Sequence, residues 1–157
     1  MTPLPWTDLL EAVRRTLVGA GLDRLSPDAV LVHPFPSDRP RELPAAPRPA
    51  ILLSPLDPEQ CDPERGTNAH DLWTFDTQLL LVGEAGGDLA SAARLYSELR
   101  ARVVGCLHQR RLPLAGSLPV VVEPLEVGDR ALFLERRVWL SRLRLHCPFL
   151  LIREPAS

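Results

Sequence analysis

The stretch Leu72-Trp-Thr-Phe-Asp-Thr-Gln-Leu-Leu-Leu-Val82, together with the helical pattern that follows it, decides the fold of this chain. Alternation along an extended backbone places five residues on one face: Trp73, Phe75, Thr77, Leu79 and Leu81. Three polar residues fall on the opposite face: Thr74, Asp76 and Gln78. This period of two, in residues of high β propensity, predicts a half-buried strand. Glycines at positions 83, 86 and 87 end it, and Asp88 is placed to cap the next element.

Two segments have the periodicity of amphipathic helices. From Asp88 to about Gln109, apolar side chains recur at three- and four-residue steps: Leu89, Ala92, Tyr96, Leu99, Val103 and Cys106. From Pro5 to Val18 a second stripe follows the same rule: Trp6, Leu9, Leu10, Val13 and Leu17. Each helix therefore has one face to bury against another layer.

The segments that flank this centre are extended. Ten of the 17 prolines lie between residues 27 and 63, which predicts mostly extended loop, with short strands at Ala29–Val32 and Ala50–Ser54. Residues 57–64 are acidic and rich in turn formers. After Val120-Val121-Val122, Gly128-Asp129 predicts a hairpin turn into a long strand from Ala131 to His146. The apolar side of that strand changes phase near Ser141, which indicates a bulge or a strand that leaves the core.

These elements predict an α+β fold: a mostly antiparallel sheet with two helices packed on one face and a long projecting β-hairpin. The 157 residues, at 17.4 kDa, fit a single domain over residues 1–157.

Composition excludes several classes of function. All 18 basic residues are arginine, so mechanisms that need lysine, such as Schiff bases and the phosphate-binding P-loop, are ruled out. The formal net charge of −2 argues against bulk electrostatic binding to nucleic acid or membrane. Three cysteines, Cys61, Cys106 and Cys147, show no metal-ligand spacing and fit a reducing compartment.

No set of residues has the spacing of a catalytic, cofactor-binding or metal-binding site, so we expect no enzyme activity, cofactor or metal. The four histidines, His33, His70, His108 and His146, make no ligand pair in sequence. The serines lack a nucleophile elbow, and residues 83–87 lack the spacing of a dinucleotide loop.

The one concentrated charge feature is a set of five arginines near the C-terminus: Arg130, Arg136, Arg137, Arg142 and Arg144. Guanidinium groups pair well with carboxylates of a partner, which makes these residues the candidate subunit or partner interface. The alternative is the solvated polar face of an edge hairpin, where charges block unwanted strand pairing.

The order of these segments resembles the tail terminator, or tail completion, proteins of long-tailed bacteriophages and related gene transfer particles. The resemblance rests on Pro49-Ala-Ile-Leu-Leu-Ser54, Trp73–Val82, Asp88–Arg100 and the final hairpin, and covers roughly residues 5–147. The proline-rich segment 34–49 and the acidic loop 57–64 depart from the family pattern.

The resemblance implies a structural virion protein that forms a homo-oligomeric ring, commonly a hexamer, on the tail tube. Such a ring ends tube polymerisation and offers a surface to the head or neck. The implied partners are other copies of the chain, the tail tube protein and a head-neck connector protein. DNA would pass through without sequence-specific binding, and no membrane is involved. The implied location is the virion tail, assembled in the host cytoplasm.

Within this family, the final hairpin and the loop 57–70 are the candidate arms between neighbours, and we expect the arginine cluster to face partner subunits. Two alternatives remain open. One is a head-completion or neck connector subunit. The other is a small enzyme or ligand-binding domain that uses His70, Asp71 and Asp76 in a cleft.

Overall fold

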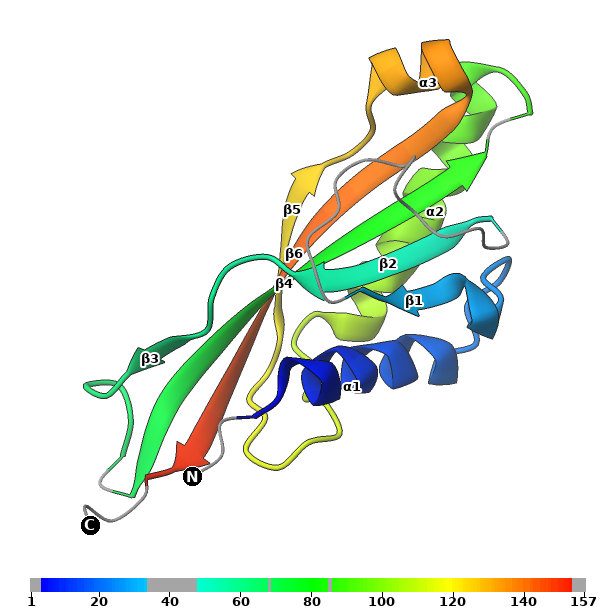
Figure 1. The fold of residues 1–157 in the computed structure, drawn as a ribbon. Helices are drawn as coiled ribbons and strands as arrows, with labels where there is room; N and C mark the ends of the chain where they lie inside the picture. The colour runs from blue at the N-terminus through cyan, green and yellow to red at the C-terminus, as the bar shows by residue number, and fades with distance from the viewer. Residues whose placement is uncertain (1–3, 34–47, 68, 85, 154–157) are drawn as a thin grey trace.

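The computed structural model describes residues 4–33, 48–67, 69–84 and 86–153. Within these ranges the chain forms three α-helices, one short 3₁₀ helix and six strands (Figure 1). Their order is α1 (Trp6–Gly19), η1 (Pro27–Ala29), β1 (Val30–Val32), β2 (Ala50–Pro55), β3 (Gln60–Asp62), β4 (His70–Glu84), α2 (Leu89–Leu107), β5 (Val121–Glu126), α3 (Arg130–Arg136) and β6 (Val138–Ile152).

All strands belong to one sheet in the order β1-β2-β4-β6-β5, with β3 paired to the first part of β4. The β1–β2 pair is parallel and every other pair is antiparallel. The two 15-residue strands β4 and β6 pair in unbroken register, from His70 opposite Ile152 to Glu84 opposite Val138. The predicted α+β class with a mostly antiparallel sheet is confirmed.

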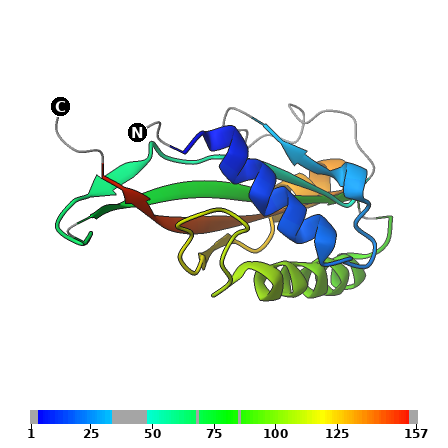
Figure 2. The same cartoon turned by 90° about the horizontal axis from the view of Figure 1, so that it is seen from below.

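The helices α1 and α2 cover one face of the sheet (Figure 2). The main core lies beneath them, and it receives the odd-numbered side chains of β4 that the sequence places on one face. Phe75 is fully buried, and its ring meets Trp6 of α1 and Phe149 of β6 edge to face, at centroid distances of 5.2 and 5.7 Å. As predicted, Asp88 caps α2: its carboxylate accepts a hydrogen bond of 2.7 Å from the Ser91 backbone N–H.

The second face of the sheet carries the even-numbered residues of β4 and β6. At the end of the sheet near α3 these residues are apolar and buried: Leu52, Leu80, Val82, Val138 and Leu140. Farther along β6 they become Arg142, Arg144 and His146. The predicted bulge or exit of the strand near Ser141 is therefore wrong, because the odd-numbered residues of β6 face the helices along the whole strand. The pattern changes there because both faces of β6 are buried at the end of the sheet near α3.

The irregularity in the ladder lies on the neighbouring strand instead. The register between β5 and β6 shifts between Pro124 and Glu126. The Glu126 carbonyl accepts hydrogen bonds from Ser141 Oγ and from the Arg100 guanidinium of α2, both at 3.0 Å. Burial lowers the pKa of Arg100, and the bonds it makes to carbonyl groups hold the bulge against α2.

The predicted hairpin turn at Gly128-Asp129 is wrong. Asp129 instead caps a helix, because its carboxylate accepts a 2.9 Å hydrogen bond from the Leu132 N–H and α3 follows at once. The helix ends at Arg137, whose φ of 55° turns the chain into β6. The strand predicted from Ala131 therefore begins at Val138, although β5 and β6 do pair antiparallel as expected.

The part of the molecule that projects is the other end of the β4–β6 ladder. Residues 70–74 of β4 and 148–152 of β6, with β3 alongside, extend past α1 (Figures 1 and 2). We call these three segments the arm. The acidic loop 57–64, predicted as loop, thus contains a short strand that belongs to the arm.

Two further points concern the rest of the chain. Of the proline-rich segment, residues 34–47 lie outside the described residues. Among the helices of the described ranges, none combines the length and the apolar character needed to cross a bilayer.

Candidate functional site

The structure divides the five predicted interface arginines into two groups. Arg130, Arg136 and Arg137 belong to α3 and its C-terminal cap, at one end of the sheet. Arg142 and Arg144 lie in the middle of β6 on the second face. The fold therefore does not bring the five together into one continuous surface.

The α3 group is exposed. Arg130 and Arg136 are open to solvent, while the Arg137 guanidinium lies 5.3 Å from the centre of the Phe133 ring, where a cation–π contact forms. Exposed apolar side chains accompany these arginines: Leu134 of α3 is 58% exposed and Val127, just before it, is 60% exposed.

The β6 arginines are half-buried and form ion pairs within the chain. Arg142 Nε lies 3.2 Å from the Glu126 carboxylate. Arg144 lies 3.8 Å from Glu123 of β5 and 3.8 Å from Asp57 in the segment between β2 and β3. These contacts tie the edge strand β5 to the centre of the sheet, so Arg142 and Arg144 serve the fold of this subunit.

His146 joins the same network from the next position of that face. Its Nδ1 lies 2.7 Å from Asp76 Oδ1 on β4, and its Nε2 lies 2.8 Å from Glu123 Oε2 on β5. Sequence reasoning missed this cluster. Its members are 70 and 23 residues apart, and only the strand register brings them together.

The imidazole and the two carboxylates contact one another across three strands, so this network ties β4, β6 and β5 together. Among the described residues, no cluster of three or more His, Cys, Asp or Glu side chains is arranged to hold a metal ion.

The enzyme alternative needs His70, Asp71 and Asp76 in one cleft, and the strand separates them. Asp71 points to the face opposite that of His70 and Asp76, and those two lie six residues, or about 20 Å, apart along β4. Each has a different partner. His70 Nδ1 lies 3.2 Å from Thr67 Oγ1, and Asp71 accepts hydrogen bonds of 2.6 and 2.9 Å from Arg153, which raise the pKa of that guanidinium.

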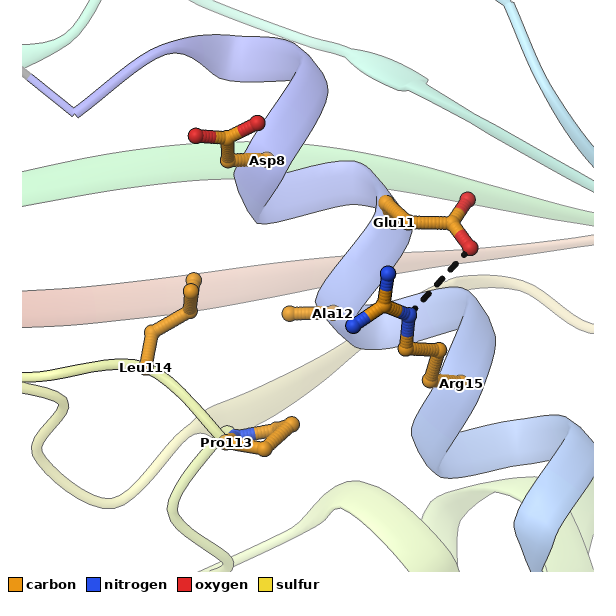
Figure 3. A pocket seen from close by; sticks show the side chains of 6 residues that line it. All are labelled: Asp8, Glu11, Ala12, Arg15, Pro113 and Leu114. Carbon is orange, nitrogen blue, oxygen red and sulfur yellow. Dashed lines mark ion pairs between the residues drawn. The ribbon is translucent and has the colours of Figure 1, made fainter.

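Two hollows lined by described residues are small or shallow. One of about 120 Å³ lies between α1 and the loop after α2, where the Arg15–Glu11 ion pair of 3.5 Å spans the rim (Figure 3). Another, of about 350 Å³, lies beside the arm and contains His70 and Ser117. The Ser117 hydroxyl accepts a hydrogen bond from the Leu112 N–H and donates one to the Leu118 carbonyl, so it fixes the loop.

The cysteines are free thiols in very different surroundings. Cys61 on β3 is exposed, whereas Cys147 on β6 is buried. Burial raises the pKa of Cys147 to about 12. Cys147 and His146 are adjacent in sequence but face opposite sides of the sheet, so they form no catalytic pair.

Comparison with known proteins finds similarity at the level of the fold. No protein-family model matches the chain, and no curated protein matches it. Among solved structures, it aligns with a chain from the virion of a native gene transfer agent (GTA) particle, at a TM-score of 0.52 and 17% sequence identity. The alignment covers 92% of this chain and 95% of that chain. The two chains share a fold.

Proposed function

We propose that this chain is a non-enzymatic structural protein of a phage-like virion, which forms a ring on the end of the tail tube. The ring, a hexamer, ends tube polymerisation and presents a surface to the head or neck. The observation that carries this proposal is the fold shared with a chain of the GTA virion over nearly the full length of both.

The surface chemistry supports an assembly role. The arm carries apolar residues beyond the cover of the helices, and Ile152 at its end is 67% exposed. The charged groups on the second face are paired with one another, which favours a scaffold over a reaction site.

The proposed partners are other copies of this chain, the tail tube protein and a head-neck connector, with DNA passing through the ring without sequence-specific contacts. The proposed location is the virion tail.

The decisive experiment combines the purified chain with assembled tail tubes. Native mass spectrometry and negative-stain imaging of the chain alone and with tubes should show a closed ring that caps tube ends. Tubes capped in this way should stop growing when fresh tube protein is added, while uncapped tubes continue.

Two results would contradict the proposal. A ring that binds the head vertex and ignores tube ends would identify a head-completion or neck subunit instead. A strict monomer that binds neither structure would remove the assembly role.

A further inference from the structure

The two ends of the sheet have surfaces of opposite character. At the α3 end, two exposed apolar side chains accompany the exposed arginines Arg130 and Arg136: Val127 and Leu134, at 60 and 58% exposure. This α3 end holds three arginines between residues 129 and 137 against two carboxylates.

The acidic segment 57–65, which includes β3, lies at the other end. It holds four carboxylates against one arginine. Asp57 pairs with Arg144 and Asp62 with Arg65, while Glu59 and Glu64 are the exposed carboxylates, beside the exposed Gln60. β3 pairs with residues 72–74 of β4, whereas α3 leads into β6 opposite Glu84. Ten to twelve residues of strand separate the two surfaces, roughly 35 Å (Figure 1).

The acidic surface also includes a strand edge. Within the described ranges, β3 pairs only with β4, so its outer edge presents backbone N–H and C=O groups that a further strand can pair with. The edge strand β5 is different, because the Val122 N–H donates to His108 Nδ1 at 3.1 Å and Pro124 has no N–H.

We propose that the α3 end of one copy binds the acidic β3 segment of the next copy; this inference rests on the proposed ring function. Arginines meet carboxylates across the contact, and Val127 and Leu134 are covered by the neighbour. The two surfaces differ, so the contact is head-to-tail. A head-to-tail contact leaves one surface of each kind unfilled until rotation closes the copies into a ring.

Charge complementarity within a single chain favours a second copy as the occupant. Every copy supplies one basic, apolar surface and one acidic surface, so each contact is satisfied without any other protein. Arg142 and Arg144 have internal carboxylate partners and lie outside the contact.

The test is a charge swap between the two ends. The first variant is Arg130→Glu with Arg136→Glu. The second is Gln60→Arg with Glu64→Arg, which spares Glu59 and Asp62 because these side chains hold internal hydrogen bonds. The matched control, Arg110→Glu with Arg111→Glu, reverses two exposed charges in the loop after α2.

Each swap variant alone brings like charges together, so we expect it to remain monomeric, with association about 100-fold weaker than in the parent chain. An equimolar mixture restores opposite charges at every contact and should form rings in which the two variants alternate. The control should form rings as the parent does. In the mixed rings, amide hydrogen exchange should slow at Gln60–Asp62 and in α3.

Three results would overturn the inference. Rings from either swap variant alone would show that the ends do not meet. A mixture of folded variants that stays monomeric would show that charge pairing is not the cause. A first variant that forms rings but no longer caps tubes would assign the α3 end to the tube. In each of these the parent chain still forms rings, whereas a monomeric parent would contradict the proposed function itself.

Discussion

The two ends of the β4–β6 ladder have the same backbone pairing and opposite surroundings. From Thr77 to Gly83, every residue of β4 is buried, with helices on one face and a second apolar cluster on the other. From His70 to Thr74, the same strand is only half-buried, although its pairing with β6 continues without a break.

The difference shows that hydrogen-bonded register and burial are independent properties of this sheet. Backbone hydrogen bonds form along the whole length over which β4 and β6 run side by side. Hydrophobic stabilisation is gained only where helices or other side chains cover the faces of these strands. We expect the body to hold the fold's stability and the arm to be available for contacts with other molecules.

The largest expected effect is in thiol chemistry. Cys61 of the arm should react with a thiol reagent in the native protein, whereas Cys147 should react at least about 1,000-fold more slowly, because its exposure requires the core to open. Desolvation and the nearby Asp71 and Asp62 raise the pKa of Cys61. Because the thiolate is the reactive form, the reaction rate should keep rising with pH beyond the pH range in which an ordinary thiol ionises. Mass spectrometry of timed samples measures both rates, and denaturant should make the two cysteines equivalent. Similar native rates would mean that the body opens as readily as the arm.

The next effect compares two leucines of the same strand. Leu79→Ala should lower the free energy of unfolding by about 2–5 kcal/mol, because Leu79 is fully buried and a cavity remains. Leu72→Ala in the arm removes the same atoms from a half-buried site and should cost less than about 1 kcal/mol. Urea denaturation of both variants gives the comparison, and equal losses would erase the distinction between body and arm.

A smaller effect is expected from adding one methyl group at the body end of β4. Gly83→Ala would place a Cβ inside the Tyr96 ring of α2, so the Tyr96 side chain or the helix must shift, at a cost of about 1–3 kcal/mol. Gly105→Ala is the control, since a Cβ there meets nothing within 4 Å and alanine favours a helix by up to about 1 kcal/mol. Thermal unfolding should therefore shift in opposite directions for the two variants. A neutral Gly83→Ala would mean that α2 is loosely packed.

The smallest effect on stability belongs to the end of the arm. Ile152→Ser should change the free energy of unfolding by no more than about 0.5 kcal/mol, because the side chain is 67% exposed. If the arm packs against a neighbour, the same substitution should reduce the fraction of rings in native mass spectrometry. Loss of stability without loss of rings would reverse the roles assigned to arm and body.

Periodicity identified the parts of the fold that depend on local pattern. Both long helices, the strand through Phe75 and the short strand at Ala50 were predictable, because their apolar residues recur at the spacing of one face. The same reasoning failed at Gly128-Asp129, since glycine followed by aspartate suits a hairpin turn and a helix N-terminus alike. Only the capping bond to Leu132 distinguishes them.

The candidate site was less predictable than the fold. The five arginines were identifiable as a group in sequence. In the structure, Arg142 and Arg144 form ion pairs within the chain. Arg130 and Arg136, the first and last residues of α3, are exposed. An arginine that pairs with a carboxylate of its own chain is less available to a partner. Those carboxylates come from other segments of the chain, so the local sequence around the arginines does not predict the pairing.

The sequence by itself determined the α+β class, the faces of the two long helices and of β4, and the exclusion of lysine chemistry. These follow from side-chain identity and from periods of 2 and 3.6 residues, which act within one segment. The tertiary structure alone decided that His146 lies between Asp76 and Glu123, that one end of the β4–β6 ladder projects as an arm, and that basic and acidic surfaces lie at opposite ends. Those properties depend on strand register and layer coverage, which join residues far apart in the chain.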